Sequence, residues 1–182
     1  MLLEHLVLMA CPRCHASLRL SEGRRGESGR VLDGKLACEA CGEQFPVVDG
    51  VPRFVPRENY ASGFGLEWTR HARTQYDSNS GIPVSEQRFF AQTHWPRDLS
   101  GQLVLEVGSG SGRFTEQAAN TGATVVSLDY SYAVDANYAS NGSKPNVLIV
   151  QADVFAMPFR PGTFDRLFCF GMLQHTPDPA RA

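Results

Sequence analysis

The feature that most constrains the fold is a regular alternation of apolar, strand-like runs and helical segments that begins at Gln102. Strand patterns cover residues 102–107, 124–129, 147–153 and 164–170, and helical segments cover Thr115–Asn120 and Ser131 to about Ser140. Strands that alternate with helices form a parallel sheet with helices on both faces. The sequence therefore predicts an α/β, Rossmann-like domain, whose ligands bind beyond the carboxyl ends of the strands.

A glycine-rich turn follows the first strand and indicates which ligand the sheet binds. Glycines at 108, 110 and 112 form the pattern G-x-G-x-G, and Arg113 occupies the place where a dinucleotide-binding turn has its third glycine. Glu106 would repel a pyrophosphate, but it suits a ligand with an ammonium group. S-adenosylmethionine is such a ligand.

Two further acids end the next two strands. Asp129 closes the second strand and Asp153 closes the third, so both are expected at the same edge of the sheet as the glycine turn. Carboxylates at strand ends also cap the following helix or turn. The residues alone leave both roles open.

The ordered set of Glu106, the glycine turn, Asp129, Asp153 and the run 164–168 resembles the class I S-adenosylmethionine-dependent methyltransferases over residues 101–178. Residues 171–178 resemble the segment after strand four in the small-molecule branch of that family. The resemblance implies an enzyme that transfers a methyl group to a small molecule. A displacement of this kind needs in-line geometry, so positioning supplies most of the catalysis.

The resemblance also implies which residues hold the cofactor. Asp129 would accept hydrogen bonds from both ribose hydroxyls, with Tyr130 beside the adenine. Asp153 would receive the adenine amino hydrogen, and the backbone of Val154 would meet a ring nitrogen. Glu106 would orient or neutralise the amino group. The full set is Glu106, Gly108, Ser109, Gly110, Gly112, Asp129, Tyr130, Asp153 and Val154.

His175 is the candidate catalytic residue, because it is the one obvious general base near the expected mouth of the site. The following residues, 176–178, form a helix-start pattern. His175 can therefore simply precede a helix.

Four of the five cysteines form two C-x-x-C pairs, Cys11 with Cys14 and Cys38 with Cys41. Four thiolates satisfy Zn²⁺ in tetrahedral geometry and leave no position for a water molecule. Disulfides would need an oxidising compartment, and a redox motif would not need a second copy. The sequence therefore predicts a structural zinc site, with the polar residues 21–30 as an exposed hairpin loop.

The residues around these cysteines, with Asp-Gly-Val-Pro at 49–52, resemble a small zinc-ribbon family over about residues 6–57. Its free-standing members bind and activate methyltransferases, and others are fused ahead of a methyltransferase domain. The resemblance implies a docking or scaffolding module and, with it, a protein partner.

Apolar periodicity between these parts predicts two short helices, Phe64–Gln75 and Ser85–Thr93, with Ser85 as an N-cap. The pieces 64–68, 74–77 and 85–90 look like a lead-in segment of zinc-ribbon-bearing methyltransferases, which implies a lid on the cofactor or a wall of the substrate pocket. Aromatic side chains at helical spacing can equally pack on the sheet.

We expect three parts, a zinc ribbon at 1–57, a helical lead-in at 58–100 and a cofactor-binding Rossmann-like half-domain at 101–182. The residues from Gln102 to Ala182 number 81. The family fold needs roughly twice as many, so we expect Ala182 to be a truncation.

The formal net charge of −2 provides no general attraction to nucleic acid or to an anionic membrane. No apolar run approaches the roughly 20 residues that span a bilayer. We therefore expect a cytoplasmic protein without a membrane or nucleic-acid partner. Two alternatives stay open, an rRNA base methyltransferase with a zinc module and a non-catalytic zinc-ribbon scaffold.

Overall fold

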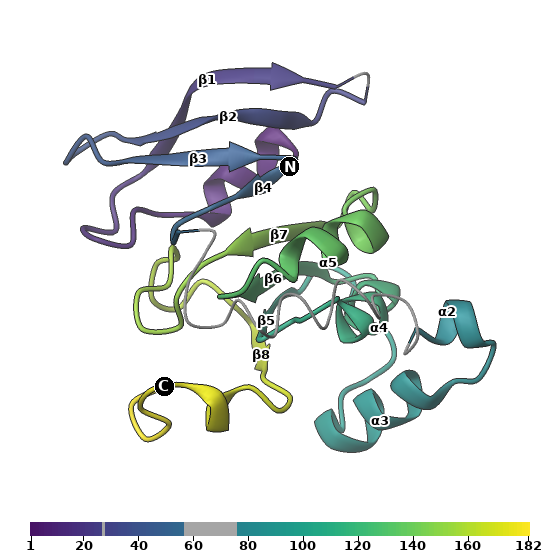
Figure 1. The fold of residues 1–182 in the computed structure, drawn as a ribbon. Helices are drawn as coiled ribbons and strands as arrows, with labels where there is room; N and C mark the ends of the chain where they lie inside the picture. The colour runs from purple at the N-terminus through teal and green to yellow at the C-terminus, as the bar shows by residue number, and fades with distance from the viewer. Residues whose placement is uncertain (27, 57–75) are drawn as a thin grey trace.

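The computed structural model describes residues 1–26, 28–56 and 76–182, which form two sheets (Figure 1). The predicted helix Phe64–Gln75, the lead-in piece 64–68 and residues 74–75 of the next piece lie outside the described residues. In the described parts, no helix is long and apolar enough to cross a membrane.

The first sheet is antiparallel and belongs to the amino-terminal module. A 3₁₀ helix η1 (Leu3–Leu8) precedes the strands, whose order in the sheet is that of the sequence. The strands are β1 (Leu18–Arg25), β2 (Val31–Cys38), β3 (Gln44–Val48) and β4 (Val51–Pro52). In register with Leu20 and Phe45, Leu36 is fully buried at the centre of this module.

The expected loop at residues 21–30 is shorter than predicted, because β1 continues to Arg25. Polar side chains of β1 form ion pairs with the neighbouring strand β2, Glu22 with Lys35 and Arg24 with Asp33. Opposite charges on neighbouring strands support pairing without an apolar face. Composition alone therefore could not distinguish this exposed hairpin from a loop.

The second sheet is parallel, in the order β7-β6-β5-β8, and confirms the predicted Rossmann-like class. Its strands are β5 (Leu103–Val107), β6 (Thr124–Asp129), β7 (Val147–Gln151) and β8 (Arg166–Phe168). Helix α4 (Arg113–Asn120) follows β5, and α5 (Val134–Asn141) follows β6. The outer strands β7 and β8 are both shorter than the predicted strands, 147–153 and 164–170.

The two faces of the parallel sheet pack differently. Alternate residues, such as Val104 and Val125, lie in one cluster with residues of α4 and α5. On the opposite face, Leu105 and Leu128 share a core with Met9 of the module. Among the described residues, the helices of this domain thus cover one face, and the other belongs to a core that continues into the module.

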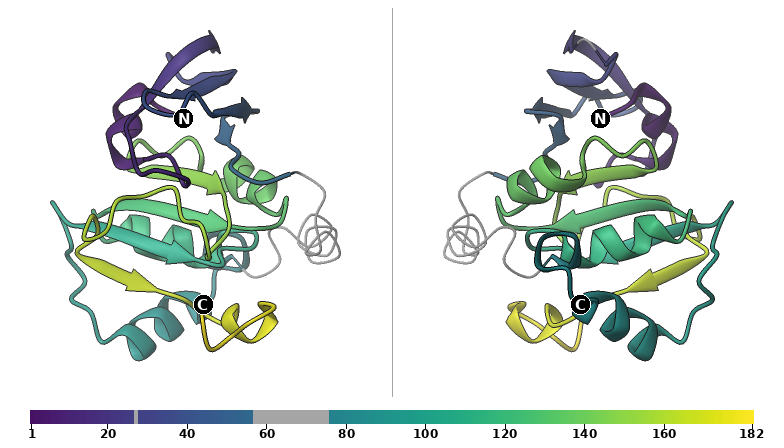
Figure 2. Two further views of the ribbon diagram at one scale, coloured as in Figure 1. Left: turned by 90° about the vertical axis from the view of Figure 1, so that its left-hand side faces the viewer. Right: turned by 90° about the vertical axis from the view of Figure 1, so that its right-hand side faces the viewer.

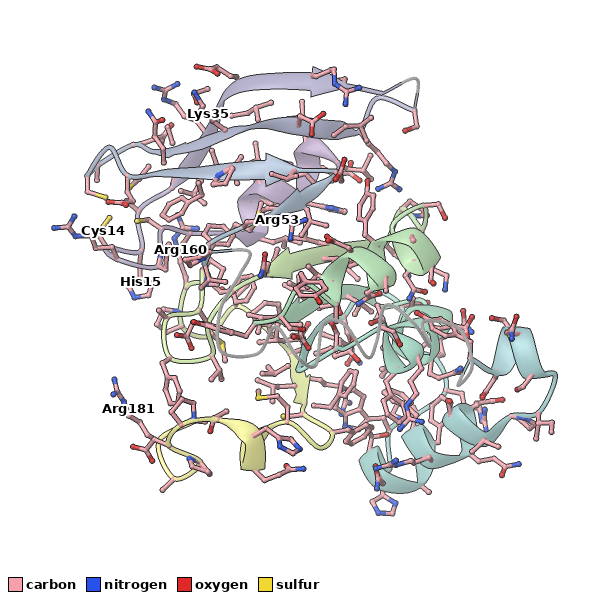
Figure 3. The ribbon with its side chains drawn as sticks, viewed as in Figure 1. Cys14, His15, Lys35, Arg53, Arg160 and Arg181 are labelled. Carbon is pink, nitrogen blue, oxygen red and sulfur yellow. The ribbon has the colours of Figure 1, made fainter. Side chains whose placement is uncertain are left out.

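The module docks on β7, at one edge of the parallel sheet (Figures 1 and 2). The Phe54 N–H donates to the Gln151 carbonyl at 2.8 Å, and Arg53 forms an isolated parallel bridge with Gln151. The Arg53 guanidinium, only 5% exposed, donates to Gln151 Oε1 at 2.8 Å and to Asp135 of α5 at 2.6 Å (Figure 3). Arg30 donates to the Ser143 carbonyl, just after α5. Arg53 and Arg30 therefore attach the module to the chain near the beginning of α5 and just after its end.

A single helical turn, α2 (Asp77–Ser80), leads into α3 (Val84–Thr93), which lies where the second short helix was predicted. The prediction that Ser85 caps α3 is wrong, because the helix begins one residue earlier. The Asp77 carboxylate accepts the backbone N–H groups of Ser85 and Glu86 at 2.9 and 2.8 Å. A carboxylate outside the helix satisfies its first donors and favours the positive end of its dipole.

Candidate functional site

A cavity opens at the carboxyl ends of the parallel strands, where the fold predicts a ligand. Its empty space, including the open mouth, is about 970 Å³. The residues that line it come from the ends of all four strands and the start of α4: Gly108, Ser109, Gly110, Ser111, Arg113, Phe114, Leu128, Asp129, Tyr130, Ser131, Ala152, Asp153, Val154, Phe170, Gly171, Met172, His175 and Thr176.

The glycine turn between β5 and α4 forms one wall of this cavity. Gly108 and Gly112 have φ values of 82° and 94°, in the left-handed region that favours glycine. A Cβ on Gly108 would lie 2.3 Å from the side chain of Met172, and one on Gly112 would lie 2.0 Å from Asn137 Oδ1. Both positions therefore require glycine, because of the backbone conformation and because neighbouring side chains leave no room for a Cβ.

Asp129 lies against the glycine turn. Its Oδ2 accepts the Gly110 N–H at 2.8 Å, and its Oδ1 accepts the backbone N–H and hydroxyl of Ser131 at 2.8 and 2.7 Å. Burial raises the pKa of this carboxyl, whereas the Gly110 and Ser131 hydrogen bonds lower it. The carboxylate thus links the β5 turn to the β6 turn while it lines the cavity.

Asp153, Tyr130 and Val154 also line the cavity, beside the ends of β6 and β7. Asp153 Oδ1 accepts the Phe155 N–H at 2.9 Å, which closes a tight turn after β7. Burial raises the pKa of Tyr130, and the charge of Asp153 adds to this effect. The structure thus brings together seven of the nine residues predicted to hold a cofactor.

Glu106 and Gly112 are the two that do not line the cavity. The Glu106 carboxylate is 2% exposed and accepts hydrogen bonds from the hydroxyls of Thr115 and Ser127, the latter at 2.9 Å. Burial raises its pKa to about 7. Glu106 therefore lies within the polar core that supports the turn.

That polar core continues to a residue that the sequence did not single out. Tyr76, 1% exposed, donates its hydroxyl to the Ser111 carbonyl at 2.5 Å and accepts a hydrogen bond from Asn141 at 3.0 Å. Asn141 also donates to the Gly112 carbonyl at 3.0 Å. The only signal in the sequence is a tyrosine close to a predicted helix boundary, and its burial against the glycine turn depends on tertiary packing.

Replacing Tyr76 with phenylalanine is expected to lower the free energy of unfolding by about 1–2 kcal/mol, because the buried Ser111 carbonyl loses its partner. Urea denaturation of the full chain measures the loss. The matched control is Tyr132→Phe, which changes another described tyrosine. We expect it to lower the free energy of unfolding by less than Tyr76→Phe does. Equal stability of Tyr76→Phe and the parent chain would contradict this role.

His175 lines the cavity at the end of a 3₁₀ helix, η2 (Leu173–His175). After it, the Asp178 carbonyl accepts the N–H groups of Arg181 and Ala182 at 3.2 Å, and Asp178 Oδ1 accepts the Arg181 N–H at 3.3 Å, so the predicted helix-start pattern of 176–178 leads into a hydrogen-bonded turn. Phe170 and Met172 line the cavity as well, although neither was among the predicted site residues. Their position just after β8 was the available signal, because ligands bind beyond strand ends.

The four predicted metal ligands, Cys11, Cys14, Cys38 and Cys41, come together in the module. Figure 3 labels Cys14, which lies at one end of the module. Their Sγ atoms all lie within 4.8 Å of one another, with Cys11–Cys41 at 3.7 Å and Cys14–Cys38 at 3.5 Å. A tetrahedral zinc ion with Zn–S bonds near 2.3 Å separates its sulfurs by about 3.8 Å. The donor set and its spacing fit Zn²⁺.

Known proteins match this chain in two separate regions. Residues 105–182 match the family model for the methyltransferase domain, and residues 3–50 match the model for Trm112p-like protein. These regions coincide with the parallel sheet and with the cysteine-bearing module.

Among similar proteins, the ubiquinone biosynthesis O-methyltransferase of Thiobacillus denitrificans is 37% identical over 86 residues, covering 45% of this chain and 37% of that protein. An uncharacterised chloroplastic methyltransferase of Arabidopsis thaliana is 23% identical over 209 residues, covering 99% of this chain and 58% of that protein. The chain therefore spans roughly a third to three-fifths of the length of these relatives.

One solved structure, a candidate S-adenosyl-L-methionine-dependent methyltransferase from Methanococcus maripaludis, shares the fold. It aligns with a TM-score of 0.50 and 16% identity, over 68% of this chain and 56% of the other.

Proposed function

We propose that this chain, whose residues 105–182 are a class I S-adenosylmethionine-dependent methyltransferase domain behind a Trm112p-like module, binds S-adenosylmethionine in the described cavity. The methyl group would pass to a small-molecule acceptor. The observation that carries the proposal is the position of Asp129, which lines the cavity while hydrogen-bonded to the glycine turn.

The proposed cofactor contacts lie at the carboxyl ends of β7, β6 and β5. Asp153 and Val154, after β7, would hold the adenine, with Tyr130 packed beside it, and Asp129, at the end of β6, would hold the ribose. Gly108, Ser109 and Gly110 would let the backbone approach the methionine part, with Gly112 keeping the turn tight. When bound, the cofactor supplies a methyl group on a positively charged sulfur. The protein's task is to hold that methyl in line with the acceptor.

His175 is the proposed general base, because it lines the cavity on the β8 side and an imidazole can accept a proton near neutral pH. It would remove the proton from the acceptor's nucleophilic atom as the methyl group arrives. His175→Ala should then lower kcat more than it raises the Kd of the cofactor.

The burial of Glu106 predicts a pH effect on the stability of the chain. In the folded chain its carboxyl keeps a proton up to a pKa of about 7, whereas an ordinary glutamate loses it near 4.5. The folded state therefore binds more protons between these values, and stability decreases as the pH rises through this window. Glu106→Gln should remove this loss and raise the free energy of unfolding at pH 8 by up to about 3 kcal/mol.

Denaturation at pH 5 and pH 8 measures this difference, with the exposed Glu4→Gln as control. If the ammonium group of the cofactor binds near Glu106, binding at pH 6.5 should also release a proton. Calorimetry in two buffers of different ionisation enthalpy detects that release. A release that is unchanged in Glu106→Gln would assign the proton to another group.

The module at residues 1–57 is proposed to act through protein contacts, of which its docking on β7 and α5 within this chain is one. A further protein partner is part of the same proposal. The division into parts 1–57, 58–100 and 101–182 also stays a prediction.

The experiment that tests the proposed function is calorimetric titration of the full chain with S-adenosylmethionine and S-adenosylhomocysteine. We expect both to bind with micromolar Kd. Absence of binding by the folded protein would favour the scaffold alternative. A complex with rRNA at low salt, detected by filter binding, would favour the nucleic-acid alternative.

A further inference from the structure

The wall of the cavity nearest β8 carries positive charge on an aromatic surface. Arg113, the first residue of α4, lines the cavity together with Phe114 and Phe170. The Arg113 guanidinium lies 4.4 Å from the centroid of the Phe114 ring, and the Phe114 and Phe170 rings are 4.9 Å apart, edge to face. A flat apolar surface with a guanidinium beside it suits an aromatic anion.

A second arginine reinforces this charge from α3. The Arg88 guanidinium lies 5.6 Å from the centroid of the same Phe114 ring. Arg88 is exposed on α3 and is not among the residues that line the cavity. Burial lowers the pKa of Arg113, and the charge of Arg88 lowers it further. The two guanidinium groups near this one ring therefore repel each other.

The nearest acid only partly offsets these charges. Asp77 favours the charged form of Arg113, but its oxygens already accept the first N–H groups of α3 at 2.9 and 2.8 Å. Within residues 1–26, 28–56 and 76–182, neither Arg88 nor Arg113 forms an ion pair. An incoming anion would relieve this repulsion.

The net charge of the cofactor does not account for the positive wall, and its single carboxylate is the competing ligand that the test below separates. S-adenosylmethionine carries a sulfonium, an ammonium and one carboxylate, so its net charge is positive. Its proposed nucleoside contacts lie at the ends of β6 and β7, while Arg113 lies toward β8 with Arg88 beyond it. The positive charge thus extends from the cavity wall to the exposed surface of α3.

We propose that Arg113, supported by Arg88, selects a methyl acceptor that carries an acidic group, a carboxylate or a phosphate, on an aromatic or apolar body. This inference rests on the proposed function and names its substrate class. The guanidinium fork would bind the acidic group, while Phe114 and Phe170 would contact the apolar body. Arg113 acts as a specificity-determining residue.

The test uses benzoate and its uncharged isostere benzamide as probes. The full chain is saturated with S-adenosylhomocysteine, and probe binding is followed by ligand-observed NMR up to 10 times the expected Kd, which is about 1 mM for probes this small. We expect benzoate to bind at least tenfold more tightly than benzamide. Arg113→Gln should abolish the preference, and Arg88→Gln should reduce it about threefold.

The control variant is Arg166→Gln, which removes an arginine stacked on Trp95 at 5.2 Å, outside the cavity. It should leave the preference unchanged. Equal binding of the two probes by the parent chain, or equal absence of binding, would overturn the inference. So would an Arg113→Gln variant that loses affinity for S-adenosylmethionine but keeps it for decarboxylated S-adenosylmethionine, because Arg113 would then serve the cofactor's carboxylate. Failure of the proposed function is seen separately, as loss of S-adenosylhomocysteine binding by the parent chain.

Discussion

Replacing Asp129 with asparagine should weaken the binding of S-adenosylmethionine by about 100-fold, because each hydrogen bond between a carboxylate and a ribose hydroxyl is worth about 1.5–3 kcal/mol. An amide presents one acceptor oxygen instead of two and loses the charge. Calorimetry on the full chain measures the change in Kd. Circular dichroism shows whether the variant is folded.

The carboxylate of Asp129 also holds the turns around it, so a control must separate the two roles. Ser131→Ala removes one hydrogen bond to Oδ1 and keeps the carboxylate, and we expect it to change the Kd less than fivefold. Asp98→Asn changes an acid outside the cavity and should have no effect. A folded Asp129→Asn variant that binds the cofactor as the parent does would refute the proposed site.

Removing zinc should unfold the amino-terminal module. Metal binding to a four-cysteine site contributes on the order of 10 kcal/mol of folding free energy, more than a core of this size supplies by itself. Cys38 is a sensitive position, since the Cys41 N–H donates to its Sγ at 3.4 Å and lowers the pKa of the thiol to about 6. The thiolate that binds metal is thereby favoured.

We expect Cys38→Ser to lose the metal, to expose residues 1–56 to proteolysis and to lower the Tm of the whole chain. The effect should spread because Met9 and Cys11 share a buried core with Leu105 and Leu128 of the parallel sheet. Metal analysis should give one zinc per parent chain. Cys169→Ser, outside the cluster, is the control. An unchanged Tm and zinc content in Cys38→Ser would contradict a structural metal site.

Unfolding of the module should also weaken cofactor binding in the cavity. Arg53 binds Asp135 of α5, Arg30 binds the Ser143 carbonyl just after α5, and Asn141 of α5 donates to the Gly112 carbonyl. A displaced α5 would therefore release the glycine turn. The apo-metal protein should bind cofactor more weakly than the zinc form, with an intact Asp129.

The strongly patterned elements could be predicted from the sequence. β6 has the predicted bounds, Thr124–Asp129, because a run of β-branched and apolar residues between Gly122 and Asp129 has few other ways to pack. The outer strand β8 was harder, since the pattern 164–170 is largely apolar but only Arg166–Phe168 pairs with β5. Strand ends depend on a neighbour, which a local pattern does not contain.

The spacing of residues in the sequence was enough to predict the four-cysteine cluster, the glycine turn, the acid that ends β6 and the acid that follows β7. Each depends on short-range geometry, in which a few bonds or the end of a strand set the place of a side chain. Tertiary structure alone decided that Glu106 lies behind the turn, that Tyr76 braces it, that the module caps β7, and that Arg88 and Arg113 meet on one ring. Those contacts join residues far apart in the chain or on different elements, and their free energy comes from burial and charge that arise only when the chain has folded.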